Sequence, residues 1–277
     1  AILEDYDYER IETPVLEETE LFLRGVGQGT DIIEKEMYSF KTRGGDSVTM
    51  RPEGTAPVAR AYIEHGMKSL PQPVKLYYIE PMFRHEQPQA GRTRQFWHIG
   101  AEQFGEGSFS ADAELIFVLW KIFEELGLKN ETTLKINSLG DKNCRPDYKK
   151  ALKDYYKNKL KKVCAPCRAK FKKNILRMLD CIQSECAEIS AKAPQIFDFL
   201  DDDCKLHLKN VLEFLEEAQV PYILNPYLVR GLDYYTRTVF EIWLEENPST
   251  DSLQGPEDPS GPRMAGPGGG IQLAGGG

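Results

Sequence analysis

The segment FRHEQPQAGRTRQFWHIGAE, at residues 83–102, contains the pattern on which the fold prediction depends. Its ends belong to two β-like runs, 75–84 and 94–104, and the residues between them are rich in proline, glycine and glutamine. Strand-like runs separated by turn-forming residues predict an antiparallel hairpin, here with a long tip. The runs 37–40 and 48–51 flank a Gly-Gly-Asp turn and predict a second hairpin.

Helical patterns are scattered between the strand candidates. Residues 54–65, 110–126 and 201–219 have apolar residues at helical spacing, and 134–139 and 222–224 read as further strands. Residues 10–16 predict one more strand, in which a proline is compatible with an edge, an end or a bulge. Hairpins without strict βαβ alternation predict an α+β fold with an antiparallel sheet. The sequence contains neither G-x-G-x-x-G nor G-x-x-x-x-G-K-[ST], so Rossmann or P-loop nucleotide binding has no support.

The composition is that of a globular chain. With 277 residues, of which 41% are hydrophobic and 28% charged, we expect one large core and a smaller appended or inserted unit. No apolar run reaches the roughly 18 residues that a membrane span needs. The acidic amino terminus lacks the pattern of a secretory signal, so we expect a soluble, cytoplasmic protein. We expect neither a membrane nor DNA as a partner.

The net charge of −8 hides a local basic region. Residues 145–180 contain 13 Lys and Arg against three acids. One interpretation is a solvated helical face, and the other is a surface that contacts RNA phosphates.

Alternation along residues 94–102 separates two faces of one strand. We expect the first face to be polar and functional and the second to be apolar. The first consists of Arg94, Phe96, His98, Gly100 and Glu102, and the second of Gln95, Trp97, Ile99 and Ala101.

Four segments, in this order, resemble the histidyl-tRNA synthetases. They are RPEGT at 51–55, the segment at 83–102, INSLGD at 136–141 and LVRGLDYYTRTVFE at 228–241. The resemblance covers 9–243 and implies a class II aminoacyl-tRNA synthetase-like antiparallel sheet flanked by helices, with a helical insertion domain.

The resemblance also implies four regions. These are a first part of the catalytic core with motifs 1 and 2 (1–143), a basic helical insertion (144–195), a second part of the core (196–246), and a Gly/Pro-rich mobile segment (247–277). Motif 3 and an anticodon-binding domain are absent from the 277 residues, so we expect the isolated chain to be weakly active or inactive.

The reaction implied is activation of histidine with ATP and Mg²⁺, followed by transfer of the histidyl group to the 3′ end of tRNA(His). Arg84 and Arg230 match arginines that support the α-phosphate from opposite sides, and their permanent charge and planar fork suit that role. We expect the two guanidinium groups to converge on one anion-sized gap. For either arginine the alternative is a surface ion pair. The family also implies a homodimer formed through the motif 1 surface near Pro14.

The family implies a set of ATP contacts and a set of histidine contacts. Glu86 would meet the adenine, Phe96 would stack on it and Arg92 would reach the outer phosphates, although a strand phenylalanine is more commonly core. Glu102 and Tyr235 would contact the imidazole, with Tyr234 beside them. The ATP set is Arg84, Glu86, Arg92, Phe96 and Arg230, and the histidine set is Glu53, Gly54, Thr55, His98, Glu102, Tyr234 and Tyr235.

Within the histidine set, Glu53 and Thr55 would meet the ammonium group. Their structural alternatives are a solvated carboxylate and a helix cap. His98 stands where the family usually has glutamine, which predicts that histidine binding weakens as the pH falls below about 6.5.

Six cysteines occur, and four of them have metal-ligand spacing. Cys164, Cys167, Cys181 and Cys186 form C-x2-C, thirteen residues, then C-x4-C, which resembles a zinc site. The alternative is a set of reduced thiols.

Two rival functions share the predicted fold. One is the synthetase-like, histidine-binding regulatory subunit of ATP phosphoribosyltransferase, which performs no aminoacylation and tends to lose the segment around Arg230. The other is a synthetase-like RNA-sensing module attached to a kinase. The intact RGLDYYT segment and the basic insertion favour the synthetase over the regulatory subunit. The kinase-attached module would need flanking domains that these residues do not show.

Overall fold

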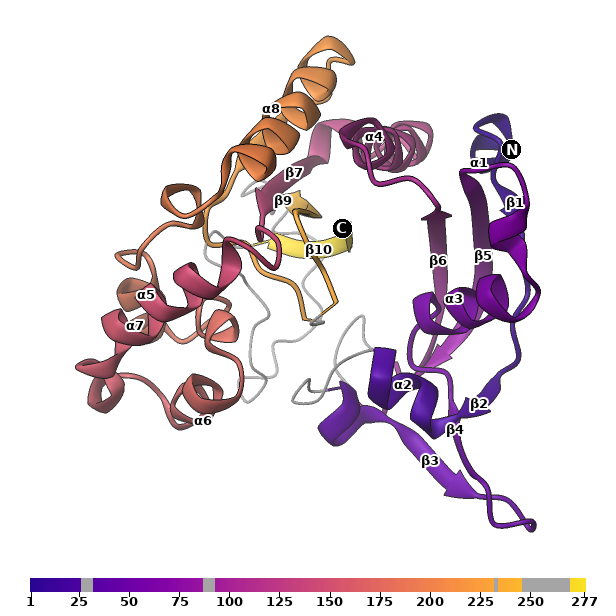
Figure 1. The fold of residues 1–277 in the computed structure, drawn as a ribbon, viewed down its shortest axis with the longest axis horizontal. Helices are drawn as coiled ribbons and strands as arrows, with labels where there is room; N and C mark the ends of the chain where they lie inside the picture. Colours follow the sequence, from indigo (N-terminus) through magenta and orange to yellow (C-terminus); the bar gives the residue numbers. More distant parts are fainter. Residues whose placement is uncertain (26–31, 87–92, 232–233, 246–269) are drawn as a thin grey trace, which may run out of the picture. The chain divides into compact units, whose positions relative to one another are not determined.

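The structure, a computed structural model, describes residues 1–25, 32–86, 93–231, 234–245 and 270–277 (Figure 1). The chain divides into two compact units, each with a core of its own. They are Ala1–Gly107 with Gly231–Tyr234, and Ser108–Arg230 with Tyr235–Gly277. This division differs from the predicted boundary at 143/144, because the strands before and after the insertion pair with each other inside the second unit.

The described strands of the first unit form two sheets. In one, of order β1-β5-β6, β1 runs parallel to β5 and β5 runs antiparallel to β6. In the other, of order β2-β4-β3, the neighbours are antiparallel. Both predicted hairpins are therefore confirmed. The strands are β1 (Glu9–Arg10), β2 (Leu16–Glu18), β3 (Tyr38–Lys41), β4 (Ser47–Met50), β5 (Val74–Phe83) and β6 (Gln95–Phe104).

The continuous strand predicted for residues 10–16 is wrong. Strand structure ends at Arg10 and resumes at Leu16. Between them, Thr13 donates its N–H and hydroxyl to the Glu80 carboxylate, and its carbonyl accepts from Arg51. Buried side chains therefore replace the neighbouring strand as hydrogen-bond partners of this backbone.

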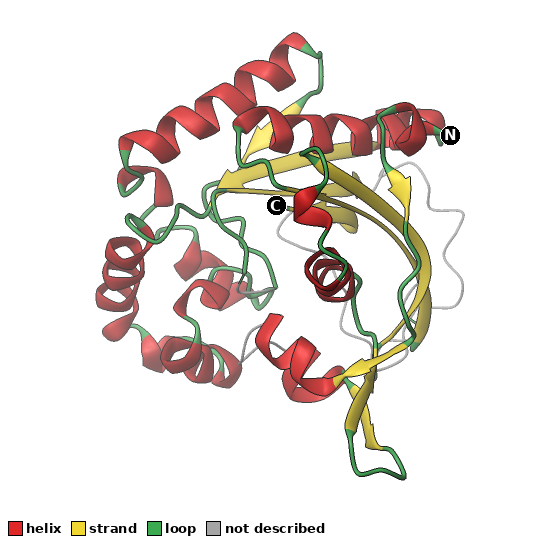
Figure 2. Cartoon of the chain, turned by 45° about the vertical axis from the view of Figure 1, so that its right-hand side comes forward, coloured by secondary structure: helices red, strands yellow, loops and turns green. Residues whose placement is uncertain are grey.

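Helix α3 (Thr55–Glu64) packs on one face of the β5–β6 hairpin (Figure 2). Val58 from α3 joins Leu76, Tyr78 and Met82 from β5 in a buried cluster. The other helices of this unit are α1 (Ile2–Asp5), α2 (Thr19–Gly25), a π-helical turn (Ile32–Glu36) and a 3₁₀ turn (Met67–Ser69).

The second unit contains a sheet of order β10-β9-β7-β8. Helices α4 (Phe109–Glu125) and α8 (Asp202–Glu217) pack against each other and against this sheet, burying Trp120 and Val211 among others. The strands are β7 (Thr132–Ser138), β8 (Tyr222–Leu224), β9 (Thr238–Glu245) and β10 (Gly270–Gly276).

The prediction of a mobile tail over 247–277 is wrong for its last residues, because Gly270–Gly276 form β10. This strand pairs antiparallel with β9, in a register that places Ile271 opposite Leu244. A side chain at Gly275 would lie 2.5 Å from the Arg230 guanidinium, so glycine here permits close approach to β9 and its neighbours. Residues 247–269 lie outside the described ranges.

The basic region 145–193 is helical, as predicted. It contains α5 (Arg145–Lys157), α6 (Ala165–Lys173) and α7 (Ser184–Ser190), joined by 3₁₀ turns. Tyr155 donates to the Ile189 carbonyl at 2.7 Å, and Tyr156 hydrogen-bonds the Ser190 hydroxyl at 2.9 Å, so α5 is fastened to α7. Within the described ranges, no helix has both the length and the apolar character needed to cross a membrane.

Candidate functional site

The start of α3 places two carboxylates of the first unit together. Glu53 accepts hydrogen bonds from the backbone N–H groups of Thr55 and Ala56, at 2.8 and 2.9 Å, and so caps the helix. The Thr55 hydroxyl donates instead to Glu102 on β6, at 2.7 Å. Glu53 is thus not a solvated carboxylate, and the Thr55 side chain links the helix to the sheet.

Glu53 is buried and Glu102 is partly buried, and neither carboxyl group has a basic side chain bonded to it among the described residues. Burial raises the pKa of Glu102 to about 8, and the charge of Glu53 adds to the effect. Burial likewise raises the pKa of Glu53, opposed by its two backbone donors and by the charge of Arg84. A cation placed between these carboxylates would stabilise both in their ionised form.

His98 lies on the same face of β6 as Glu102. Gly100, between them on that face, is paired with Tyr78 of β5. Its Nδ1 is buried and has no hydrogen-bond partner among the described residues. Burial and then the charge of Arg84 lower the pKa of His98 to about 4. The imidazole therefore stays neutral well below pH 6.5, which moves the predicted weakening of histidine binding through His98 to a pH near 4.

Arg84 follows β5 and lies next to Phe96 of β6. Its guanidinium carbon is 5.1 Å from the centre of the Phe96 ring, and its Nε donates to the Pro52 carbonyl at 2.8 Å. The Glu86 carboxylate is 3.8 Å from Nη1. Since Arg84 is one-quarter exposed, its remaining N–H groups can meet an anion. Three of the predicted ATP contacts, Arg84, Glu86 and Phe96, are thus neighbours.

Two glycines fit closely around Tyr78. A Cβ added at Gly54 would lie 2.2 Å from the Tyr78 ring, and one added at Gly100 would lie 2.1 Å from it. The ring therefore occupies the space beneath the helix start and the β6 strand. Gly54, predicted to contact histidine, precedes α3 as its N-cap.

The two faces of β6 differ in exposure, and the apolar face is the more exposed one. His98 and Glu102 lie on the face that packs toward α3, whereas Trp97 and Ile99 are 68% and 56% exposed. The alternation was predicted correctly, and its polar face is the more buried one because α3 covers it.

Arg51 is a structural residue that the sequence analysis missed. It is 2% exposed, pairs with Glu80 at 2.7 Å, and donates to the Thr13 and Pro81 carbonyls. Nothing in RPEGT marks Arg51 as buried, because its partner Glu80 is distant in sequence.

The second unit holds Arg230 through a partly buried ion pair. Its Nη1 lies 2.7 Å from the Glu241 carboxylate, which also accepts from Trp243 Nε1 at 3.0 Å. The Tyr235 ring lies 5.6 Å from the guanidinium carbon. The alternative of a surface ion pair is wrong for Arg230, because its side chain is only 15% exposed.

The three remaining predicted site residues, Tyr234, Tyr235 and Arg92, do not lie in one unit of the described structure. Tyr234 groups with the first unit and is partly exposed, whereas Tyr235 is buried in the second. Arg92 lies outside the described residues. Because Arg84 and Arg230 belong to different units, their convergence on one anion stays a prediction.

The four cysteines with metal-ligand spacing do come together. Their sulfur atoms all lie within 4.8 Å of one another. A second group with mutual distances below that limit is formed by Asp141, Cys144, Asp201 and Cys204.

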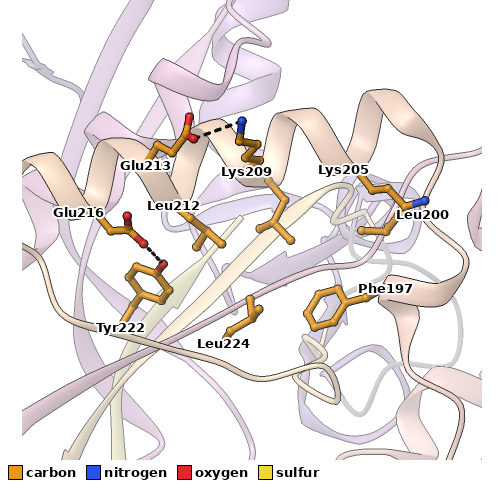
Figure 3. Close-up of a pocket in the computed structure, with 10 residues that line it drawn as sticks. Phe197, Leu200, Lys205, Lys209, Leu212, Glu213, Glu216, Tyr222 and Leu224 are labelled. Carbon is orange, nitrogen blue, oxygen red and sulfur yellow. Dashed lines mark hydrogen bonds and ion pairs between the residues drawn. The ribbon is translucent and has the colours of Figure 1, made fainter.

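A surface groove lies elsewhere, between α8 and β8 (Figure 3). It encloses about 530 Å³, and its polar side chains pair locally, Lys209 with Glu213 and Tyr222 with Glu216. None of the predicted site residues lines it. We therefore assign no catalytic or binding role to this groove.

Comparisons with known proteins agree on one family. A family model described as histidyl-tRNA synthetase matches residues 1–250. A histidine–tRNA ligase from Dehalococcoides mccartyi is 50% identical over 237 residues, which are 86% of this chain and 56% of that protein. The crystal structure of apo S. aureus histidyl-tRNA synthetase is similar with a TM-score of 0.69 and 38% identity, over 90% of this chain and 56% of that one.

One further solved structure shares the fold alone. It is described as an ATP phosphoribosyltransferase regulatory subunit/histidyl-tRNA synthetase from Bacillus halodurans C. Its TM-score is 0.61 at 23% identity, over 89% of this chain and 66% of that one. The chain therefore spans little more than half the length of the curated relative and of the S. aureus enzyme that it matches.

Proposed function

Because the chain belongs to the histidyl-tRNA synthetase family, we propose that it carries the catalytic core of a histidine–tRNA ligase. The reaction joins histidine to ATP, giving histidyl-adenylate and pyrophosphate, and then transfers the histidyl group to the 3′ end of tRNA(His). The protein acts in the cytoplasm, and the basic helices α5 and α6 contact tRNA phosphates, which position RNA without reading its bases.

The observation that carries this proposal is the Glu53–Thr55–Glu102 cluster, in which Glu53 is buried and the other two residues are partly buried. Both carboxylates accept from Thr55, Glu53 from its backbone N–H and Glu102 from its hydroxyl, and with no described basic side chain bonded to them they favour a cationic ligand over a neutral one. The ammonium group of histidine meets Glu53 and Thr55. The Glu102 carboxylate accepts from the imidazole N–H, and the Tyr235 hydroxyl donates to the other ring nitrogen. An apolar amino acid would leave these polar groups unpaired and is rejected.

The adenylation step needs fixed cations, since the attacking carboxylate and the α-phosphate are both negative. Arg84 supplies one, held in place by the Pro52 carbonyl and the Phe96 ring. Arg230 supplies the other, oriented by Glu241. Phe96 and Glu86 contact the adenine, and Arg92 contacts the outer phosphates. Mg²⁺ enters with the nucleotide phosphates, and we assign no pair of described carboxylates to it.

We also propose that the protein is a homodimer, formed through the motif 1 surface near Pro14 as the family implies, and that the second copy also covers the outer face of the β5–β6 hairpin. Ile79 and Ile99 are directly paired across the hairpin, and Trp97 pairs with Pro81 on the same face. Ile79, Trp97 and Ile99 are 42%, 68% and 56% exposed. Adjacent exposed apolar side chains of this size are typical of an interface.

The test is histidine-dependent exchange of labelled pyrophosphate into ATP, run on the protein at its full natural length and on the 277-residue chain. We expect the full-length protein to show exchange with histidine and none with phenylalanine, and the 277-residue chain to show weak exchange or none. Arg84→Ala should reduce the rate by roughly 100-fold or more, the loss typical of removing one group that stabilises transition-state charge. Lys68→Ala is the control. It removes a positive side chain from the 3₁₀ turn after α3 and should leave the rate unchanged.

Histidine binding without any exchange in the full-length protein would contradict the ligase. That result would instead favour the regulatory subunit, which binds histidine and performs no aminoacylation.

A further inference from the structure

The helical insertion contains a cysteine cluster that the proposed reaction does not use. Cys164 directly precedes α6 and Cys167 lies in its first turn. Cys181 follows the 3₁₀ helix Ile175–Met178, and Cys186 lies in α7. All four are free thiols, and their sulfur atoms lie within 4.8 Å of one another. Three separate segments of the insertion therefore meet at one point.

The spacing of the sulfur atoms fits a tetrahedral metal site. Zinc binds thiolate sulfur at about 2.3 Å, which places two ligands of a tetrahedron about 3.8 Å apart. The Cys164 and Cys181 sulfurs are 3.8 Å apart. A disulfide would need about 2.05 Å, so this pair has the separation of two ligands and not of a bond.

The geometry of the cluster offers one backbone donor to sulfur and a centre closed to water. The backbone N–H of Cys164 points at the Cys186 sulfur at 3.3 Å, and such a donor stabilises negative charge on sulfur. Cys167 and Cys186 are 1% and 2% exposed, so the centre is protected from water.

The charge of the surrounding segment also favours a zinc ion bound by four thiolates. A Zn²⁺ ion with four thiolates has a net charge of −2, and residues 145–180 contain 13 Lys and Arg against three acids. A negative centre inside a basic segment reduces the mutual repulsion of its cations. Four neutral thiols would leave that repulsion unchanged.

We propose that Cys164, Cys167, Cys181 and Cys186 bind one structural Zn²⁺, releasing their four thiol protons to solvent. All four coordination positions are filled by protein, so the ion has no open site for substrate. It fastens the start of α6 to the turn before α7 and to α7 itself, and α7 is in turn fastened to α5. The ion thereby fixes the fold of the basic insertion. This inference does not depend on the aminoacylation chemistry.

The second cluster has a structural explanation and provides a control. One Asp141 oxygen accepts from the Asn143 and Cys144 N–H groups, and Asp201 caps α8 by accepting from the Cys204 N–H at 2.8 Å. The Arg237 guanidinium, 3.9 Å from the other Asp141 oxygen, opposes a cation there. Cys144 and Cys204 should therefore hold no metal.

The experiment measures zinc in the full 277-residue chain after anaerobic incubation with Zn²⁺ and removal of free metal. We expect about one zinc per chain in the wild type and in the Cys144→Ser/Cys204→Ser control. Cys164→Ser/Cys181→Ser should bind zinc at least about 10–100-fold more weakly, since even outer-shell losses have effects of that size. With Co²⁺ alone, the wild type and the control should show the visible absorption of tetrahedral cobalt and a thiolate charge-transfer band.

Three results would overturn the proposal. They are zinc-free wild-type chain after this treatment, unchanged zinc content in Cys164→Ser/Cys181→Ser, and a cobalt spectrum of the wild type without the thiolate band. The cobalt measurement uses the wild type, so it decides the question even when the double variant does not fold.

Discussion

Glu102 shows how burial sets the protonation of a single residue. Its carboxyl group lies inside the first unit, hydrogen-bonded to Thr55 and close to Glu53, with no basic side chain bonded to it among the described residues. The ligand-free protein therefore favours the protonated form of Glu102 in the folded state. A cationic ligand would favour the ionised form of Glu102, so the protonation state of this residue depends on the charge of the ligand.

We predict that the free energy of unfolding of the ligand-free chain falls as the pH rises from about 4.5 to about 8. In this window the folded state holds a proton on Glu102 that the unfolded state has released, so each rise in pH favours unfolding. The loss of stability due to Glu102 is complete above the folded-state pKa. It amounts to a few kcal/mol, since one pKa unit corresponds to about 1.4 kcal/mol.

Glu102→Gln keeps the shape and removes the titration. Urea unfolding should show the variant close to the wild type at about pH 5 and more stable at about pH 8.5. Glu9→Gln, on the exposed strand β1, is the control and should follow the wild type throughout. A stability difference between Glu102→Gln and the wild type that does not change with pH would refute the buried, raised pKa.

At the scale of elements, one ion pair joins segments that are distant in sequence. Arg51, just after β4, bonds Glu80 of β5 and the Thr13 and Pro81 carbonyls. It therefore fixes the irregular chain between β1 and β2 against β5. Since Arg84 and Glu53 follow these same elements, the pair also supports the position of the candidate site.

We predict that Glu80→Gln destabilises the chain by about 3–5 kcal/mol, because it leaves the Arg51 charge buried without its partner. The urea midpoint should fall while the slope of the transition is unchanged. Glu12→Gln removes an exposed ion pair with Arg10 and should cost about 0–1 kcal/mol. Equal costs for the two variants would show that the buried pair has no special role.

At the scale of the whole molecule, each unit is assembled from segments separated along the chain. The second unit pairs β7 with β9, although about a hundred residues lie between them. The insertion is therefore accommodated between two strands that hold each other. The first unit leaves the outer face of β5 and β6 apolar and exposed, which is the basis of the proposed homodimer.

We predict that Trp97→Glu converts the dimer to monomer, because it places a charge within the apolar face formed with Ile79 and Ile99. Light scattering after size exclusion measures the mass directly. Ile63→Glu is the control, since Ile63 on α3 is 66% exposed and lies outside that face. A wild-type chain that is monomeric at all concentrations tested would contradict the homodimer.

The order of motifs, the hairpins and the helices of the insertion could all be predicted from the sequence. Periodicity and turn residues are local properties, so they sufficed for β5, β6, α3 and α8. The family followed from four short segments. The strand predicted over 10–16 failed because its backbone bonds Glu80 and Arg51, two residues distant in sequence.

The state of the site depended on tertiary structure. Sequence identified Glu102 and His98 as polar residues of one face, but only packing under α3 shields them from water and moves their pKa values in opposite directions. The same holds for the four cysteines, whose spacing suggested a metal while only folding brought their sulfurs together. Burial and convergence are properties of the folded chain, because they arise from contacts between residues that the sequence keeps apart.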